Sequence, residues 1–464
     1  MFQRLMTGFE NKRCLFLFLC STWLCLVWPV PSEVMGFHRN LPLYLSVLAA
    51  LSCAPDWSSW LSFSPANRLP VISFALLSGV VVIVGLVFSG KGLGFLQVFH
   101  VKWLRPVFMA GVAWVLFSEV DKRRIRISRS WLFFAVVLVL WCVPALHLGR
   151  FLWTAWHTGH FPWQENWYSY SRMELSVHVN LVISLLMAEL VVRAIRKQRC
   201  MPVNSMWLLG MLLVAVSSLF SLATRNASIG FLSMTMSITL MVLLVKFRTT
   251  AWWKILVYAL AGMSLVSVLG WLSWISDPRW QSLRETAPLA WDIEHHSTWK
   301  DRDRYPAPVM SNGQPVDISA YERIAWIKVG LLLVAKEPWG HGIDGLNFHH
   351  LVEKYYGPSA TTSQSHSGII NFLLAHGVVG TLLLVIFLGS LVRLGWLGFY
   401  RRDSLPGFFL SMLVLGFFFR GMWDDIWRDS MLEEFAFLTM FLFCWCQASM
   451  SDATDGAVIS SEKV

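Results

Sequence analysis

The feature that most constrains this chain is a series of long apolar segments that recurs along the whole sequence. Each segment holds about 17 to 20 largely apolar residues, enough for a helix to cross ~30 Å of hydrocarbon. Only helices and closed barrels satisfy their backbone polar groups in a bilayer, and runs without alternation are typical of helices. Only 14% of the residues are charged and 56% are hydrophobic, whereas soluble domains carry about 25% charged residues. The sequence therefore predicts an all-α, polytopic integral membrane protein.

We predict about twelve transmembrane helices, embedded among membrane lipids. Their approximate limits are 14–30, 41–55, 70–88, 104–119, 131–148, 176–193, 206–222, 228–245, 254–274, 367–391, 407–421 and 431–448. The first follows Lys12 and Arg13, as the apolar part of a signal peptide would. It lacks a small-residue cleavage site and leads directly into further spans, so we interpret it as the first anchor.

The basic residues between the spans predict the orientation of the chain. Most of them fall on one side of the twelve-span arrangement. They lie near the N-terminus and in loops at 122–129, 193–199, 246–254 and 393–402. Because cytoplasmic loops are enriched in Lys and Arg, we expect both termini in the cytoplasm. The same bias explains the net charge of +10 without a nucleic-acid partner.

This arrangement divides the chain into four parts. They are spans one to nine over 1–274, a large periplasmic loop over 275–366, spans ten to twelve over 367–448 and a cytoplasmic tail over 449–464. Loops longer than ~15 residues are uncommon unless they are functional or disordered, and this one is not of low complexity. Ser319 and Glu322 fit a capping box, in which two side chains satisfy backbone donors of the first helical turn. We therefore predict a helix at about 320–336 in the loop, ended by Pro338 and Gly340.

The cysteines and the paired histidines do not predict a metal or disulfide site. The eight cysteines lie in or beside apolar runs, so there is no disulfide framework in the long loop. Cys444 and Cys446 point to different sides of one predicted helix. Two pairs of adjacent histidines do not share a face, and no thiol or HExxH pattern accompanies them. These pairs are His295 with His296 and His349 with His350. We expect no metal and no cofactor.

His366 is the strongest candidate for a chemical role. It begins the span that follows the long loop, at the outer end of a helix that runs inward. The positive end of the helix dipole disfavours the imidazolium form and keeps the ring neutral, as a general base requires. Taken alone, a histidine at this place is more often a polar residue at the membrane boundary. By contrast, we interpret His376, ten residues further, as a packing residue.

The sequence that follows His366 carries a resemblance to a known family. The chain reads His-Ser, then nine residues, then Gly377-Val-Val-Gly380-Thr381. This resembles the signature of the bacterial O-antigen ligase family, which is His, then Asn, Ser or Gln, nine residues, and Gly-x-x-Gly-Thr. Twelve spans with a large periplasmic loop after the ninth are also similar to that family. We interpret the two glycines as packing residues that let a neighbouring helix approach closely.

The resemblance also implies a role for two arginines. In the family, two periplasmic arginines and the motif histidine carry the activity, and the matching positions here are Arg225 and Arg323. The segment Pro-Trp-Gly-His-Gly at 338–342 is similar to a Pro-x-x-Gly-x-Gly segment of the family, which we expect to form a turn. The predicted spans place both arginines and His366 at helix N-termini on one side, where backbone N–H groups favour anions. Arginine also contacts phosphate in a bidentate way. Contact with phospholipid headgroups is the alternative role.

The implied reaction is glycan transfer at the outer surface of a Gram-negative inner membrane. An acceptor hydroxyl attacks the anomeric carbon of a glycan carried on undecaprenyl pyrophosphate, and His366 takes its proton. Arg225 and Arg323 stabilise the departing pyrophosphate without a metal, and a single attack inverts the sugar carbon. The short region after the last span favours lipid A–core oligosaccharide as the acceptor, since many protein-glycosylating relatives are longer.

Four further residues are weaker candidates for substrate contacts. They are Asp424, Asp425, Trp163 and Trp167. The two aspartates lie in the short turn before the last span, where they orient His366 or an acceptor sugar, or pair with nearby arginines. The two tryptophans belong to an aromatic segment at 149–175, which stacks against sugars or forms an interfacial aromatic belt.

Other functions stay open at this point. The resemblance extends to O-antigen polymerases and to O-oligosaccharyltransferases that modify Ser or Thr of pilin-type proteins. A twelve-span transporter or flippase is the alternative from another class. Transporters usually show two related halves and ionisable groups near the bilayer midplane. Here the charged residues are expected at span ends.

Overall fold

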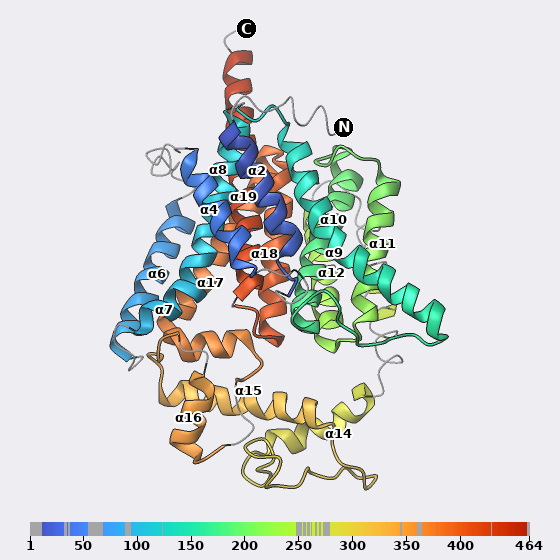
Figure 1. Ribbon diagram of the computed structural model, residues 1–464, viewed down its shortest axis with the longest axis vertical. Helices are drawn as coiled ribbons and strands as arrows, with labels where there is room; N and C mark the ends of the chain where they lie inside the picture. Colours follow the sequence, from blue (N-terminus) through green and yellow to red (C-terminus); the bar gives the residue numbers. More distant parts are fainter. Residues whose placement is uncertain are drawn as a thin grey trace.

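The structure, a computed structural model, describes most of the chain. The described residues are 12–31, 35, 38–53, 68–88, 94–122, 124–246, 279–343, 346–359, 364–427 and 429–461, with single residues between 253 and 271. Across these residues the fold is all-α, with one isolated bridge and no strand, as predicted. Figure 1 shows a helical bundle, with the start of α2 and the end of α19 at one end and a separate layer of helices at the other.

The bundle consists of long and short helices that follow one another along the chain. They are α2 (Lys12–Val27), α4 (Asn40–Ser52), α6 (Arg68–Phe88), α7 (Phe95–Phe99), the π-helix at His100–Leu104, α8 (Arg105–Asp121), α9 (Arg129–Thr158), α10 (Arg172–Arg196), α11 (Ser205–Ser221), α12 (Arg225–Lys246), α17 (Gly368–Arg402), α18 (Leu405–Trp423) and α19 (Asp429–Ser461). Among the described residues, eight helical segments are long and apolar enough to cross a membrane. This confirms a polytopic membrane protein.

The predicted spans match these helices with differences in their bounds. The predicted spans at 14–30 and 41–55 are the shorter helices α2 and α4, and the predicted span at 206–222 is α11. The predicted span at 254–274 lies almost entirely outside the described residues, so the count of twelve stays a prediction. Helix α9 continues ten residues beyond its predicted end, because apolar residues follow Arg150 up to the left-handed Gly159 that ends the helix.

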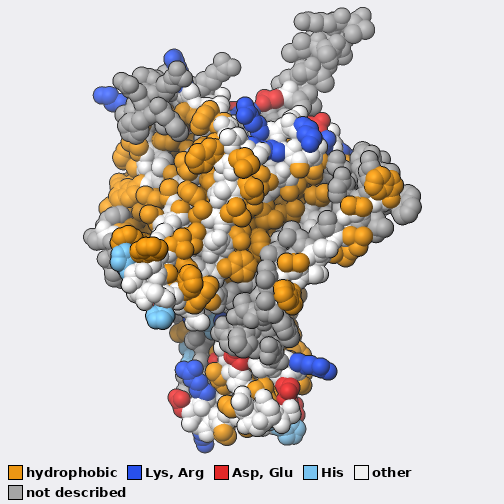
Figure 2. Space-filling view, turned by 90° about the vertical axis from the view of Figure 1, so that its right-hand side faces the viewer, with side chains coloured by type: hydrophobic (Ala, Val, Ile, Leu, Met, Phe, Trp, Pro, Cys, Tyr) orange, Lys and Arg blue, Asp and Glu red, His pale blue; other side chains and the backbone are white. Residues whose placement is uncertain are grey.

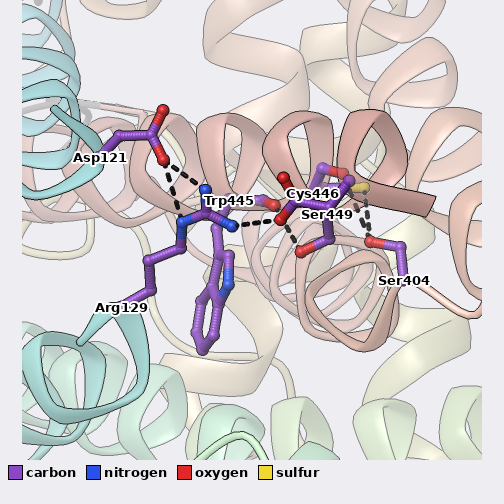
Figure 3. A network of polar contacts seen from close by, with 7 residues as sticks. Asp121, Arg129, Ser404, Trp445, Cys446 and Ser449 are labelled. Carbon is purple, nitrogen blue, oxygen red and sulfur yellow. Dashed lines mark hydrogen bonds and ion pairs between the residues drawn. The ribbon is translucent and has the colours of Figure 1, made fainter. Parts of the chain in front are cut away.

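The surface of the bundle is banded, as the bilayer requires. On the face seen in Figure 2, apolar side chains cover the middle of the bundle, and Lys and Arg side chains lie at the end opposite the layer. Ion pairs join helices at this basic end. Arg196 of α10 pairs with Asp403 after α17 at 3.1 Å. Arg129 of α9 bonds Asp121 of α8 and also Asp452 of α19, the latter at 2.8 Å (Figure 3). The predicted basic loops at 122–129 and 193–199 therefore lie at one end of the bundle.

The opposite end carries a layer of three helices, α14 (Arg279–Trp291), α15 (Ile318–Lys336) and α16 (Asn347–Tyr356) (Figure 1). This layer has an apolar core of its own, which includes Trp299, Tyr321, Trp326, Phe348 and Leu351. Helix α15 confirms the predicted helix at 320–336. Its cap was predicted wrongly, because Asp317 accepts the backbone N–H of Ala320 and the helix begins at Ile318. Glu322 therefore lies inside the helix and is buried.

Helix α17 joins this layer to the bundle. It is interrupted by a kink at Gly377, whose backbone has the non-helical φ of +69°. Its first part, 368–376, has two opposite apolar faces. Ile370 and Leu374 belong to the core of the layer, while Phe372 belongs to the core of the bundle. Its second part, 378–402, packs in the bundle against α6 and α18. The predicted span at 367–391 is thus two helical pieces.

The break in α17 is filled by the segment 338–342. The N–H of His341 donates to the carbonyl of Leu374 at 2.9 Å, and the N–H of Gly342 donates to that of Ala375 at 2.7 Å. In return, the N–H of Val378 donates to the carbonyl of Pro338 at 2.9 Å. These bonds satisfy backbone groups that the interrupted helix cannot satisfy itself. The segment predicted to form a turn is therefore inserted into a helix.

Two motif glycines have structural roles that the sequence analysis described incompletely. A Cβ on Gly377 would meet the backbone of Trp339 at 2.5 Å, and its positive φ is unfavourable for other residues. Gly380 packs against Val80 of α6, which confirms a packing role for that residue. Thr381 donates its hydroxyl to the carbonyl of Gly377 at 2.9 Å, which satisfies a backbone acceptor at the break. Gly377 is thus a conformational residue as well as a packing one.

Candidate active site

Arg225 is the first residue of α12 and lies beside the layer. Its Nη2 is 3.3 Å from Oδ2 of Asp317, the residue that caps α15. Both side chains are about nine-tenths buried, at 11% and 12% exposure. The ion pair joins the start of a bundle helix to the start of a layer helix. The carboxylate of Asp317 therefore occupies the N-terminus of α15, which we had expected to face an anion.

Arg323 lies in the second turn of α15, not in the first as expected, because the helix begins at Ile318. It is half-buried and three residues before Trp326, so the two side chains share one face of the helix. Its charge acts on the guanidinium of Arg420, which places it toward the bundle. Burial raises the pKa of the neighbouring Glu322 carboxyl, and the positive charge of Arg323 opposes that rise.

His366 lies two residues before the first residue of α17 and is half-buried. Its ring stacks on Trp326 of α15, with centroids 5.3 Å apart and planes inclined by 17°. Trp326 is itself fixed, because its Nε1 donates to the carbonyl of Trp299 at 2.9 Å. The backbone of His366 has φ +54°, a left-handed conformation that is uncommon for residues with a side chain. Such strain is found where the surrounding structure holds a residue in place.

Helix α15 connects the three predicted catalytic residues, because it contains one of them and contacts the other two. Asp317 at its start holds Arg225, Arg323 follows in its second turn, and Trp326 in its third turn stacks on His366. The three residues come from α12, α15 and the segment before α17. This arrangement places two cations and an imidazole at the end of the bundle that faces the layer.

The turn after α18 adds a buried ion pair to this region. Asp424 is 2.5 Å from Nη2 of Arg420, and the side chains are only 4% and 2% exposed. Asp424 also accepts a hydrogen bond from Nδ2 of Asn226, the residue after Arg225, at 2.5 Å. The predicted local pairing of Asp424 with an arginine is thus observed. Asn226 was not predicted as a site residue, and its position next to Arg225 is the one signal for it in the sequence.

The remaining candidates for substrate contact lie in different surroundings. Asp425 is half-buried in the same turn as Asp424. Trp163 is 55% exposed and packs on Phe151, with ring centroids 5.3 Å apart. Trp167 lies 5.2 Å from the guanidinium of Arg150. Both tryptophans therefore pack against the end of α9, and the contacts described for them do not include His366.

His376 is buried within α17 and packs on Phe372 at 4.4 Å and on Trp103 at 6.0 Å. This fits its predicted packing role. Two ion pairs are buried inside the bundle. Arg105 of α8 pairs with Glu433 of α19 at 2.8 Å, and His178 of α10 pairs with Glu434 of α19 at 3.0 Å, with all four side chains at most 5% exposed. All four residues lie near the starts of the predicted spans at 104–119, 176–193 and 431–448, which agrees with the expected position of charges at span ends.

In the described part of the chain, one group of three side chains has the spacing of metal ligands. The ligand atoms of Cys14, Cys53 and Glu119 lie within 4.8 Å of one another, near the basic end of the bundle. The thiol of Cys14 donates to Glu119 at 3.1 Å, and Arg124 pairs with the same carboxylate at 3.3 Å. Protein groups thus already satisfy the only carboxylate of the group. The sequence analysis missed this cluster because its members lie far apart in the chain.

Comparison with known proteins identifies one family. Residues 209–385 match the model of the family described as O-antigen ligase. The matched region runs from α11 to the second part of α17, and it contains Arg225, Arg323 and His366. No curated protein matches the chain. Members of the family are glycosyltransferase-like ligases and polymerases. Residues 209–385 of the chain are therefore similar to the O-antigen ligase family.

Proposed function

We propose that this membrane protein transfers a glycan from undecaprenyl pyrophosphate to lipid A–core oligosaccharide at the periplasmic face of a bacterial inner membrane. The observation that carries the proposal is that α15 contains Arg323 and contacts both Arg225, through Asp317, and His366, through Trp326. All three residues lie inside the segment that matches the O-antigen ligase family. They supply a base and two cations, which are the groups that this transfer needs.

His366 acts as the general base in this proposal. Transfer requires that a proton leave the acceptor hydroxyl as its oxygen attacks the anomeric carbon, and an imidazole accepts protons near neutral pH. The stacked indole of Trp326 and the left-handed backbone hold the ring in one orientation. A base that is already held in a productive orientation lowers the entropic cost of reaching the transition state. A single displacement by the acceptor inverts the sugar carbon.

Arg225 and Arg323 stabilise the pyrophosphate that leaves. Negative charge develops on the leaving oxygen as the glycosidic bond breaks, and fixed cations stabilise that charge most strongly where water is excluded. The ion pair with Asp317 orients the guanidinium of Arg225, and a guanidinium contacts phosphate oxygens in a bidentate way. Two arginines then supply the charge neutralisation that a metal ion supplies in other phosphate chemistry.

The proposal is tested by deleting the gene and restoring it with variants. The deletion strain should lose long-chain lipopolysaccharide, the wild-type gene should restore it, and His366→Ala should not. His295→Ala is the matched control, because His295 lies in the same layer but its side chain is 78% exposed and bonded to Asp292 at 2.9 Å. Restoration by His366→Ala, with the protein inserted at normal levels, would remove His366 from the reaction.

The same strains distinguish the possible acceptors. Normal lipopolysaccharide with an unmodified pilin in the deletion strain would assign a protein acceptor to the same chemistry. Loss of glycan length, with single repeat units still attached to lipid A–core, would assign polymerisation. Accumulation of lipid-linked glycan on the cytoplasmic side would assign a flippase. Each outcome other than loss of attached long glycan contradicts ligation to lipid A–core.

A further inference from the structure

The most deeply buried cation near the candidate site belongs to Arg420. It lies in the last turn of α18 with a side chain that is 2% exposed. Its Nη2 is 2.5 Å from Oδ2 of Asp424 and 2.8 Å from the hydroxyl oxygen of Ser176 on α10. Desolvating such a pair costs several kcal/mol per ion, which packed apolar residues of similar volume would avoid. A buried pair of this kind is therefore weak evidence for a stabilising role, and a role in positioning neighbouring residues becomes the alternative.

The turn at 422–424, next to Arg420, makes hydrogen bonds to the start of α12 and to the start of α17. The carboxylate of Asp424 accepts from Asn226, the second residue of α12 and the neighbour of Arg225. The backbone carbonyl of Asp424 accepts the N–H of Gly368 at 3.1 Å, at the first residue of α17. The carbonyl of Met422 accepts the hydroxyl of Ser367 at 2.9 Å. The turn at 422–424 thus contacts the residues next to Arg225 and next to His366.

The rest of the Arg420 side chain faces protein, not substrate. Its Nε and Nη1 are buried without a hydrogen bond, as are both side-chain polar atoms of Asn180. These residues line a cavity of about 10 Å³ between α10, α12 and α18, which has room for a single water molecule. A glycan or a pyrophosphate does not fit there. Any effect of Arg420 on the reaction therefore acts through other residues.

We propose that Arg420 is a positioning residue for glycan transfer. It fixes the turn at 422–424 through Asp424, and this turn fixes the starts of α12 and α17 relative to one another. Arg225 and His366 are thereby held at the spacing that the reaction requires. The inference rests on the proposed function, in which these two residues act on one substrate. It adds a residue outside the matched family segment, which ends at residue 385.

The bundle supplies a matched control for this proposal. Arg105 is also buried and paired, 2.8 Å from Glu433 of α19, and it donates to Asn40 of α4 at 2.8 Å. Its partners lie on helices that carry neither Arg225 nor His366. Removing this pair tests the general cost of losing a buried ion pair in the same bundle.

The experiment compares three variants of the full-length protein in detergent and in membranes. They are Arg420→Lys, the double variant Arg420→Met with Asp424→Leu, and the control double variant Arg105→Met with Glu433→Leu. Each double variant removes both charges, so no unpaired charge is left buried and folding is preserved. Transfer is measured with lipid-linked glycan and lipid A–core, both extracted from the deletion strain. Thermal stability and amide hydrogen exchange are measured without substrate.

We expect both double variants to keep the thermal stability of the wild type. The Arg420 double variant and Arg420→Lys should lose about 100-fold in kcat, with a much smaller change in donor KM, because a displacement of ~1 Å in a catalytic group costs about that factor. Amides at 225–228 and 366–371 should exchange faster in these two variants. The Arg105 double variant should keep the rate and the exchange pattern of the wild type.

Two results would overturn the proposal. One is wild-type turnover in the Arg420 double variant, and the other is unchanged exchange at 366–371. An equal loss of turnover in the Arg105 double variant would also overturn it, since the effect would then be a general one of buried pairs. Failure of the proposed function is recognised separately, by transfer in His366→Ala. The exchange measurement then still decides whether Arg420 holds the two helix starts.

Discussion

At the scale of single residues, the site depends on side chains that are held by neighbours rather than free in solvent. The indole of Trp326 lies against His366, and the carboxylate of Asp317 lies against Arg225. The sequence predicted His366 and Arg225 from a motif and a helix end. It did not predict Asp317 as a partner, because the two residues are far apart in the chain and any aspartate fits the cap of a helix.

The geometry of arginine can be tested directly at these positions. We expect Arg225→Lys and Arg323→Lys each to lower the transfer rate by about tenfold or more, because lysine keeps the charge but loses bidentate contact with phosphate oxygens. The rate is measured with the donor and acceptor described above. Lys328→Arg, a change of the same kind elsewhere on α15, serves as the control. A variant with the wild-type rate would remove that arginine from the phosphate site.

At the scale of elements, the break in α17 determines how the layer is attached. Hydropathy predicts a continuous span through Gly377, since a glycine among apolar residues also occurs in unbroken helices. The break becomes visible only with the segment 338–342, whose backbone groups bond to Leu374, Ala375 and Val378. A pattern read along one helix cannot show bonds that come from another part of the chain.

The break makes Gly377 sensitive to a methyl group. We expect Gly377→Ala to lower the free energy of unfolding by about 1 kcal/mol or more, because alanine is strained at positive φ and its Cβ would meet the backbone of Trp339. Gly389→Ala in the same helix is the control, since nothing lies within 4 Å of its added Cβ. Thermal unfolding in detergent measures both. Equal stability of the two variants would contradict the role of the break.

The stability of the connection between α15 and α16 should depend on pH. Hydrogen bonds from Lys354, at 2.5 Å, and from the hydroxyl of Tyr355, at 2.6 Å, lower the pKa of the Glu337 carboxyl. A carboxyl whose pKa is lowered on folding stabilises the fold above its ordinary pKa. That stabilisation is lost as the pH falls through the lowered value. We therefore expect residues 347–356 to become more accessible to protease below about pH 4.

The control for this pH dependence is Glu337→Gln. The amide cannot ionise, so the variant should show weaker protection of 347–356 at neutral pH and little further loss on acidification. Protease digestion at a series of pH values, with an acid-stable protease, measures the difference. The same acid response in both proteins would show that another group controls this region.

At the scale of the whole molecule, the sequence predicts which surfaces face lipid and which face water. It predicts less well which buried side chains contact one another. Apolar runs and basic loops predicted the bundle and its basic end, where Arg129 and Arg196 are found in ion pairs. They did not predict the buried pair of Arg105 with Glu433. One charge in a span of twenty residues hardly changes its mean hydropathy, and its partner is decided by how the helices pack.

The joint between the layer and the bundle has a consequence for how such a protein can diverge. Main-chain groups of 338–342 and of α17 make that joint, so it does not depend on most side chains around it. Trp339 is 65% exposed, and Val378 and Val379 are also exposed on the outer surface. Substitutions there leave the frame intact. Substitutions can therefore accumulate on this surface one residue at a time, while the way the layer is attached to the bundle is inherited unchanged.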